Sequence, residues 1–184
     1  MIDMTLNEID RMLAEARIGR LCLAEVDGRP YCIPLPFCWT GGALYLRLPL
    51  TGRKGTILAE NDRVCFEVDE PGAVFAYGRF ECDTAIAYAS VIAFGRIRVV
   101  EDRTAKEAFC RALMSKYAPA DGSRPQGFFP RLAQISVYAI GIERLTGKAT
   151  PLPAAADRWP AADLSKTPNA RPPMPGFARD SVSD

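Results

Sequence analysis

The chain has 184 residues, of which 48% are hydrophobic and 24% are charged, and it contains no histidine. This length suits a single domain. The formal net charge of +1 leaves no basic excess of the kind that nucleic-acid and anionic membrane-surface binders carry. The missing histidine excludes Ser-His-Asp and Cys-His catalysis, imidazole ligands for zinc, and a haem held by a proximal histidine. Any catalysis must therefore use other side chains or a cofactor.

The N-terminus is polar and alternates in charge, which is unlike a secretory signal, and no apolar run approaches the length of a membrane span. We therefore expect a soluble cytoplasmic protein. None of the cysteines forms a C-x-x-C pair, and their spacing argues against a metal site. In a reducing compartment we expect six free thiols. They are Cys22, Cys32, Cys38, Cys65, Cys82 and Cys110.

In the first half of the chain, Thr5 and Glu8 have the spacing of a capping box, which predicts a helix over residues 5–16. An Asp27-Gly28 turn between two apolar runs predicts a hairpin, and a third run extends it to a three-stranded meander. The basic segment at 52–60 is typical of a short helix. The expected strands cover residues 18–26, 30–38, 43–48 and 63–69, the last one ended by Pro71-Gly72.

The second half begins with a long strand over residues 87–101 that has Gly95 in its middle. An interior glycine indicates a bulge, a barrel corner or the close approach of another group. Thr104 and Glu107 form a second capping-box pattern, which predicts a helix over 104–117, and 134–143 reads as the final strand. Six or seven strands, mostly joined by hairpins, favour a closed or partly closed antiparallel barrel over a doubly wound sheet.

The last 35 residues differ in composition, since they contain seven of the fifteen prolines and little apolar periodicity. We therefore predict a barrel domain over residues 1–149 and a largely extended, proline-rich tail over 150–184.

Two glycine–lysine segments suggest phosphate binding. The segment from Gly141 to Lys148 has the wrong spacing for a P-loop and no helix after it, so we interpret Lys148 as a solvated turn residue. The segment Gly52-Arg53-Lys54 is better placed, because it follows a strand and opens a helix. Backbone amides, the helix dipole and two cations would converge there on an anion. The alternative is an exposed basic turn.

Two strand features have a structural and a functional interpretation. The segment Pro34-Leu35-Pro36 is unusual inside a strand, because proline cannot donate to the ladder. It is either an edge lying against a planar ligand or an edge protected from aggregation. Glu67 and Asp69 share one face of their strand and are interpreted as solvated, with the opposite face packing inward.

Taken in order, the motifs resemble the FMN-binding split-barrel superfamily of pyridoxamine 5′-phosphate oxidase-like flavoproteins, and within it the nitroimidazole-resistance branch. The resemblance covers about residues 5–149. The motifs that carry it are Ile18-Gly19-Arg20-Leu21, Pro30-Tyr31-Cys32-Ile33-Pro34-Leu35 with Phe37, Leu44-Tyr45-Leu46-Arg47, Gly52-Arg53-Lys54, Asn61-x-x-Val64-Cys65-Phe66-Glu67-Val68, Tyr88-x-Ser90-Val91, Gly95 and Gly147-Lys148.

The resemblance implies a mainly β (α+β) fold, a six-stranded antiparallel split β-barrel with flanking helices, which forms a homodimer with FMN at the subunit interface. It also implies roles for individual residues. The phosphate would be held by Gly52, Arg53 and Lys54. The isoalloxazine ring would lie beside Pro34, Leu35 and Pro36, and be bordered by Leu46, Arg47 and Leu48. The segment approaching the flavin, from the same or the partner subunit, would contain Tyr88, Ser90 and Val91. Gly95 would be a barrel-strand glycine near that interface.

One position departs from the family pattern, because Arg47 stands where nitroimidazole-resistance proteins usually carry a histidine. A guanidinium there would hold an anionic substrate or the polar edge of the flavin, or would face solvent. The leading hypothesis is an FMN-dependent oxidoreductase that reduces a small electrophile with electrons from a nicotinamide nucleotide or another donor. Alternatives are a non-catalytic flavin- or ligand-binding sensor, a deazaflavin in place of FMN, and a haem-binding split barrel with a cysteine, tyrosine or lysine ligand.

Overall fold

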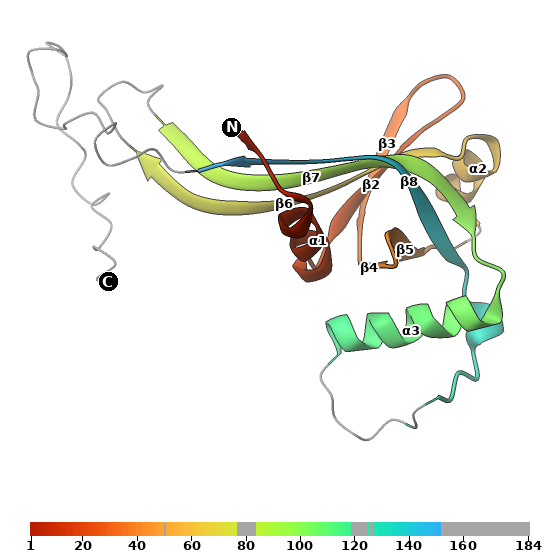
Figure 1. The fold of residues 1–184 in the computed structure, drawn as a ribbon. Helices are drawn as coiled ribbons and strands as arrows, with labels where there is room; N and C mark the ends of the chain where they lie inside the picture. The colour runs from red at the N-terminus through yellow and green to blue at the C-terminus, as the bar shows by residue number, and fades with distance from the viewer. Residues whose placement is uncertain (50, 77–83, 119–124, 126, 152–184) are drawn as a thin grey trace, which may run out of the picture. The chain divides into compact units, whose positions relative to one another are not determined.

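The computed structural model describes residues 1–49, 51–76, 84–118, 125 and 127–151, so the expected tail from residue 152 onward lies outside the described residues. One curled antiparallel sheet dominates the fold, in the order β3-β2-β6-β7-β8-β5-β4, with β1 paired to β8 (Figure 1). The helices are α1 (Leu6–Glu15), α2 (Arg53–Glu60) and α3 (Arg103–Tyr117), with a 3₁₀ turn at Leu132–Gln134. The strands are β1 (Ile2–Asp3), β2 (Gly19–Ala24), β3 (Pro30–Leu35), β4 (Phe37–Thr40), β5 (Ala43–Arg47), β6 (Arg63–Ala76), β7 (Thr84–Val99) and β8 (Val137–Thr150).

The chain divides into two compact units, residues 1–70 with 89–149 and residues 71–88 with 150–184. The first unit contains all three helices and most of the sheet. The second unit contains the ends of β6 and β7, where an added Cβ at Gly72 would lie 2.9 Å from the carbonyl oxygen of Ala87. The expected end of the strand at Pro71-Gly72 is therefore wrong, because β6 continues through this pair and Gly72 permits the close approach of β7.

The sheet is split at Pro36. Strands β3 and β4 lie at opposite edges of the sheet, yet the chain passes from one to the other through this single residue. The expected continuous strand over 30–38 is therefore wrong, and so is the expected meander, because β2–β3 and β4–β5 are separate hairpins. Across the interior, the rings of Phe37 and Phe66 meet edge to face with their centroids 4.9 Å apart.

The prolines of β3 are explained by the register of the hairpin. The amide of Glu25 donates to the carbonyl of Arg29 over 2.9 Å, so these two residues form a hydrogen-bonded pair. Hydrogen-bonded and non-hydrogen-bonded pairs alternate along an antiparallel ladder. Pro30 and Pro34 therefore both occupy non-hydrogen-bonded positions, where their nitrogens face the free edge of the sheet. No ladder donor is lost, as is expected for proline in an edge strand.

The first and third helices both pack against β4. The predicted capping box of α1 is confirmed: the side chain of Thr5 accepts from the amide of Glu8, and that of Glu8 accepts from the amide of Thr5. The predicted capping box of α3 is wrong, because Asp102 is the N-cap and its carboxylate accepts from the amide of Ala105 over 2.6 Å. The helix therefore begins close to the predicted position through a different cap.

The main core joins α1 and α2 to one face of the sheet. Its fully buried members alternate along the strands, as expected for side chains that share one face of a sheet. The largest of them are Leu13, Leu21, Phe37, Leu44, Leu46, Phe66, Val68, Val91 and Ile140. On the opposite face Arg20 donates to Glu67 over 2.8 Å and also to Asp69. The predicted outward face of β6 is thus partly exposed but tied by ion pairs to β2.

The last strand is longer than predicted, and its position explains Gly95 and Lys148. An added Cβ at Gly95 would lie 2.0 Å from the carbonyl oxygen of Gly141, so the interior glycine of β7 marks the close approach of β8. Lys148 is not a turn residue. It lies on β8 opposite Asp3 of β1 and forms an ion pair with it.

Candidate functional site

Helix α2 begins without a side chain that caps it. Its N-cap is Gly52, whose φ of 81° lies in the left-handed region that glycine adopts without strain. No side chain accepts from the first turn, and that turn contains no acidic residue. The carbonyl of Gly52 already accepts from the amide of Thr56 over 3.1 Å. The first amides of the helix therefore remain available to an anion, and the helix dipole favours one.

The two cations at this helix start have different surroundings. The guanidinium of Arg53 donates to the carboxylate of Glu25 through two nitrogens, over 2.7 and 2.8 Å. It also lies over the ring of Tyr31, at 4.5 Å from the ring centroid. Lys54, in contrast, makes no ion pair with any described residue. Of the two cations predicted to hold the phosphate, only Lys54 makes no ion pair within the described residues.

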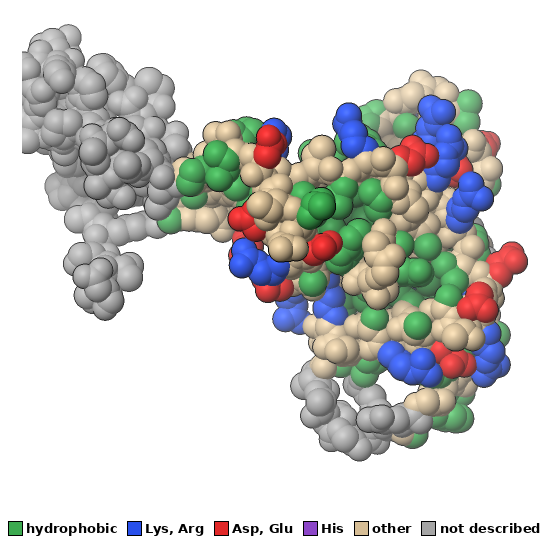
Figure 2. Space-filling view, in the orientation of Figure 1, with side chains coloured by type: hydrophobic (Ala, Val, Ile, Leu, Met, Phe, Trp, Pro, Cys, Tyr) green, Lys and Arg blue, Asp and Glu red, His purple; other side chains and the backbone are tan. Residues whose placement is uncertain are grey.

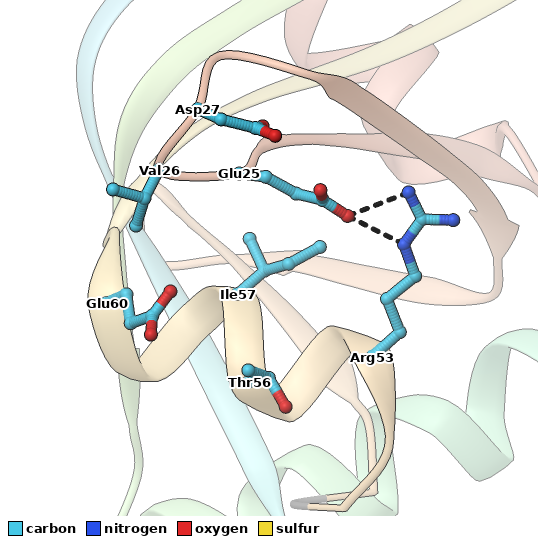
Figure 3. Close-up of a pocket in the computed structure, with 7 residues that line it drawn as sticks. All are labelled: Glu25, Val26, Asp27, Arg53, Thr56, Ile57 and Glu60. Atoms are coloured by element: carbon cyan, nitrogen blue, oxygen red, sulfur yellow. Dashed lines mark hydrogen bonds and ion pairs between the residues drawn. The ribbon is translucent and has the colours of Figure 1, made fainter.

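A cavity of about 490 Å³ lies between α2 and the turn that joins β2 to β3 (Figure 3). Three carboxylates line it, and the single cation that accompanies them is the paired Arg53. Glu25 and Asp27 also form ion pairs with Arg29, so Glu60 is the lining carboxylate of this α2 cavity that makes no ion pair within the described residues. Its lining residues are Glu25, Val26, Asp27, Arg53, Thr56, Ile57 and Glu60.

A second cavity, of about 460 Å³, lies where the end of β5 meets α3 and the 3₁₀ turn. We call it the Arg47 cavity. Its walls are mostly apolar, and its polar groups are one guanidinium, one amide and one hydroxyl. Arg47 is exposed and makes no ion pair or hydrogen bond within the described part of the chain. The lining residues are Pro36, Arg47, Leu48, Pro49, Leu113, Gln134, Ile135 and Ser136.

Helix α3 forms one wall of this cavity, and hydrogen bonds of Tyr117 hold the end of the helix in place. The hydroxyl of Tyr117 accepts from the amide of Phe37 over 3.0 Å, and its oxygen lies 2.8 and 2.9 Å from the carbonyl oxygens of Arg17 and Phe37. Burial raises the pKa of Tyr117. Burial also lowers the pKa of the neighbouring Lys116, whose ammonium lies over the ring of Phe37. The end of α3 is therefore anchored beside Pro36.

The thiols of Cys110 and Cys38 are not activated by their surroundings. Burial raises the pKa of Cys110, and the charge of Arg47 only partly opposes that effect. Burial likewise raises the pKa of Cys38. Neither cysteine therefore has the lowered pKa that is typical of an activated nucleophile.

The structure brings together some of the predicted site residues and separates others. Pro36, Arg47 and Leu48 line one cavity, and Gly52, Arg53 and Lys54 form the start of α2. Four of the residues are buried in the core, namely Leu35, Leu46, Leu48 and Val91. Pro34 is exposed on the free edge of β3, while Tyr88 and Ser90 are half-buried on β7. The roles of all twelve residues toward FMN stay predictions.

Several residues of these sites were missed by the sequence analysis. Leu113, Gln134, Ile135 and Ser136 reach the Arg47 cavity only because α3 packs against β4 and against the 3₁₀ turn. No local pattern marks them. Glu25 was also missed, although an acid just before a hairpin turn and a basic helix start are both visible in the sequence.

Within the described residues, no cluster of cysteine and acidic side chains could hold a metal ion. The described helices are all too short or too polar to cross a membrane. Figure 2 shows acidic and basic side chains interspersed among the described residues of the face in view.

Residues 5–149 match the pyridoxamine 5′-phosphate oxidase family. The chain belongs to this family. The match spans the predicted domain and leaves out the tail, and it confirms the predicted split-barrel fold. No curated protein sequence matches the chain at a significant level.

Solved structures similar to this family member include three bacterial proteins. A candidate 5-nitroimidazole antibiotic resistance protein of Bacteroides thetaiotaomicron is 20% identical, with a TM-score of 0.67 over 80% of this chain and 86% of that one. An FAD-binding protein of Mesorhizobium loti is 25% identical, with a TM-score of 0.57 over 82% of this chain and 98% of that one. An FAD and haem binding protein of Mycobacterium smegmatis is 23% identical, with a TM-score of 0.67 over 84% of this chain and 79% of that one.

Proposed function

We propose that this protein binds a flavin, FMN, and acts as an FMN-dependent oxidoreductase on a small electrophilic substrate. The observation that carries the proposal is the uncapped start of α2, where Gly52 and Lys54 offer backbone amides and an ammonium to an anion in a member of the pyridoxamine 5′-phosphate oxidase family. The similarity to the FAD-binding protein of Mesorhizobium loti supports a flavin ligand.

The start of α2 fits the phosphate of FMN. Its first-turn amides donate to no side chain that caps the helix, and a phosphate oxygen would accept from them. Lys54 would add a charge-assisted bond. Arg53 would contribute less to phosphate binding than Lys54. Its guanidinium is already paired with Glu25 and lies over the ring of Tyr31, beside the α2 cavity.

The Arg47 cavity fits the ring system. Its apolar walls suit a planar heterocycle, while Gln134 and Ser136 provide hydrogen-bonding groups for a polar ring edge. When bound, the flavin supplies hydride and electron transfer, which this histidine-free chain has no side chains to perform. The chain's own residues bind and orient the partners, and the apolar walls limit the access of water.

The position of Arg47 favours anionic substrates for the proposed activity. Its guanidinium is exposed, lines the cavity and lacks a carboxylate partner within the described residues. A carboxylate or phosphate on the substrate would supply that partner in a bidentate pair. We further propose that a nicotinamide nucleotide donates the electrons, and that the protein forms a homodimer in which FMN lies at the subunit interface.

The test is the absorption spectrum of the freshly purified protein, followed by titration of the flavin-free protein with FMN and with FAD. We expect yellow protein, about one FMN per chain and tighter binding of FMN than of FAD. Protein that remains colourless and takes up neither flavin would overturn the proposal.

Steady-state oxidation of NADH or NADPH with an electron acceptor then separates an enzyme from a flavin-binding sensor, which would bind without turnover. Light scattering of the eluting protein tests the homodimer. Flavin binding by a strict monomer would contradict the interfacial site while leaving flavin binding intact.

A further inference from the structure

Two cysteines lie directly opposite each other on β2 and β3, outside both cavities. Cys22 is the register partner of Cys32, and the thiol of Cys22 donates a hydrogen bond to the sulfur of Cys32 over 3.3 Å. The side chain of Cys32 is exposed on the edge strand, and that of Cys22 is partly exposed beside it. Both lie on the outer face of the sheet, away from the core.

The register places this pair at the positions where a cross-strand disulfide forms most readily. Counting from the hydrogen-bonded pair of Glu25 and Arg29, the alternation of the ladder makes Cys22 and Cys32 a non-hydrogen-bonded pair. In such pairs the Cα atoms are about 4.5 Å apart and the side chains are at their closest, which is within the range that a disulfide spans. An S–S bond of about 2.0 Å would need the sulfurs to approach by little more than 1 Å.

A third cysteine, Cys65, is an alternative disulfide partner for Cys22. Cys65 on β6 is the register partner of Cys22 on its other side. Because the backbone groups of Cys22 point away from β3, they point toward β6, so Cys22 and Cys65 form a hydrogen-bonded pair. Their Cα atoms are then about 5.5 Å apart and their side chains are more distant. Cys32 is therefore the favoured partner of Cys22.

We propose that Cys22 and Cys32 are an oxidisable thiol pair, which hydrogen peroxide converts to a disulfide that thiols reduce again. Cys32 loses its proton, and its thiolate attacks one peroxide oxygen. The O–O bond breaks, Cys32 becomes a sulfenic acid, and the leaving hydroxide takes up the proton from Cys32 as one water. The thiol of Cys22 then displaces the sulfenic hydroxyl and loses its proton, which gives the disulfide and a second water. Two thiols lose two electrons and two protons in total, and the peroxide is reduced to two waters.

The surroundings of the two sulfurs indicate that Cys32 reacts with the peroxide before Cys22 does. Burial and the adjacent thiol raise the pKa of Cys22 to about 12, so Cys22 is a poor first nucleophile. Cys32 is the more exposed of the two and meets the oxidant first. The bond would tie the edge strand β3 to β2 close to Tyr31, whose ring supports Arg53 at the start of α2.

The experiment is peptide mapping of the native full-length protein after mild peroxide treatment and alkylation of the remaining thiols. Cleavage after Arg20 and Glu25 separates the two cysteines into peptides 21–25 and 26–47, whereas cleavage at arginine alone does not, because Pro30 follows Arg29. We expect these two peptides to be joined, with fragmentation placing the bond at Cys32 rather than Cys38, and to separate on treatment with dithiothreitol.

Three variants sharpen the result. Cys32→Ser and Cys22→Ser should each abolish the bond, while the matched control Cys65→Ser should retain it. If a variant at Cys22 fails to fold, the mapping of the natural sequence and the exposed Cys32→Ser variant still decide. A bond from Cys22 to Cys65, a bond to Cys38, or Cys32 recovered only as its free thiol or sulfinic acid would overturn the proposal.

Discussion

At the scale of single residues, the adjacent side chains of Arg53 and Lys54 have different contacts, although both belong to one basic motif. Arg53 is paired with Glu25 and stacked on Tyr31, so most of its donors face another part of the protein. Lys54 has no such partner among the described residues and stands at the uncapped start of α2. The motif was predicted as one unit with two equivalent cations. The structure separates a positioning arginine from a candidate ligand.

The first prediction concerns this separation. Lys54→Met should weaken FMN binding by roughly 10- to 100-fold, because a hydrogen bond to a charged group contributes about 1.5–3 kcal/mol. Arg53→Met should weaken it less and should instead lower the thermal stability, because it removes the closer ion pair of Glu25, a side chain that is only 18% exposed, and leaves only the pair with Arg29 at 3.4 Å. Fluorescence titration and thermal melts measure both effects. Equal losses of FMN affinity would contradict the separation.

The second prediction concerns Arg47. With the paired acceptors 4-nitrobenzoate and 4-nitrobenzamide, Arg47→Gln should lower kcat/KM for the carboxylate by about three- to tenfold and leave the amide nearly unchanged, since exposed ion pairs are partly screened. Arg47→Lys is the matched control that keeps the charge and should lose less. Equal losses for both acceptors, together with weaker FMN binding, would instead assign Arg47 to the polar edge of the flavin.

At the scale of elements, close backbone approach explains the glycine in the middle of β7. Gly95 leaves no room for a side chain, because the carbonyl oxygen of Gly141 lies 2.0 Å from the position that a Cβ would take. The reverse is not true: a Cβ at Gly141 would have its nearest neighbour, the carbonyl oxygen of Arg96, at 4.0 Å. The sequence marked Gly95 as unusual and left three explanations open. It could not name the partner, since β8 follows some forty residues later.

The third prediction uses this asymmetry. Gly95→Ala should destabilise the protein by about 1–3 kcal/mol or more, because the added methyl group must displace backbone. Gly141→Ala, on the facing strand, is the matched control and should change stability by less than about 1 kcal/mol in either direction. Urea unfolding curves measure the difference. Similar midpoints for the two variants would contradict the close contact of β7 and β8.

At the scale of the whole molecule, local patterns predicted the elements but not their order in the sheet. Capping, periodicity and turn residues located α1, α2 and most strands within a few residues. The two hairpins were instead joined into one meander, because nothing local shows that Pro36 carries the chain from one edge of the sheet to the other. The candidate site shows the same limit. Its motif residues were predicted, whereas Gln134 and Ser136 depend on long-range packing.

Tyr117 holds the chain in place next to Pro36, where the sheet is split. One hydroxyl at the end of α3 accepts from the amide of Phe37 and reaches the carbonyls of Phe37 and Arg17, so it joins β4 to the segment that follows α1. These contacts span sequence separations of 80 and 100 residues. A single polar group therefore connects three parts of the first unit at the point where the sheet is split.

The last prediction tests this connection. Tyr117→Phe keeps the half-buried ring but leaves the amide of Phe37 unsatisfied, which should lower stability by about 1–3 kcal/mol and the melting temperature by about 2–4 °C for each kcal/mol. Tyr45→Phe, on β5, is the matched control, because the described contacts give its hydroxyl no hydrogen bond. Thermal melts and amide hydrogen exchange at Phe37 measure the effect. An unchanged melting temperature with unchanged protection of that amide would show that the sheet keeps its split edge without Tyr117.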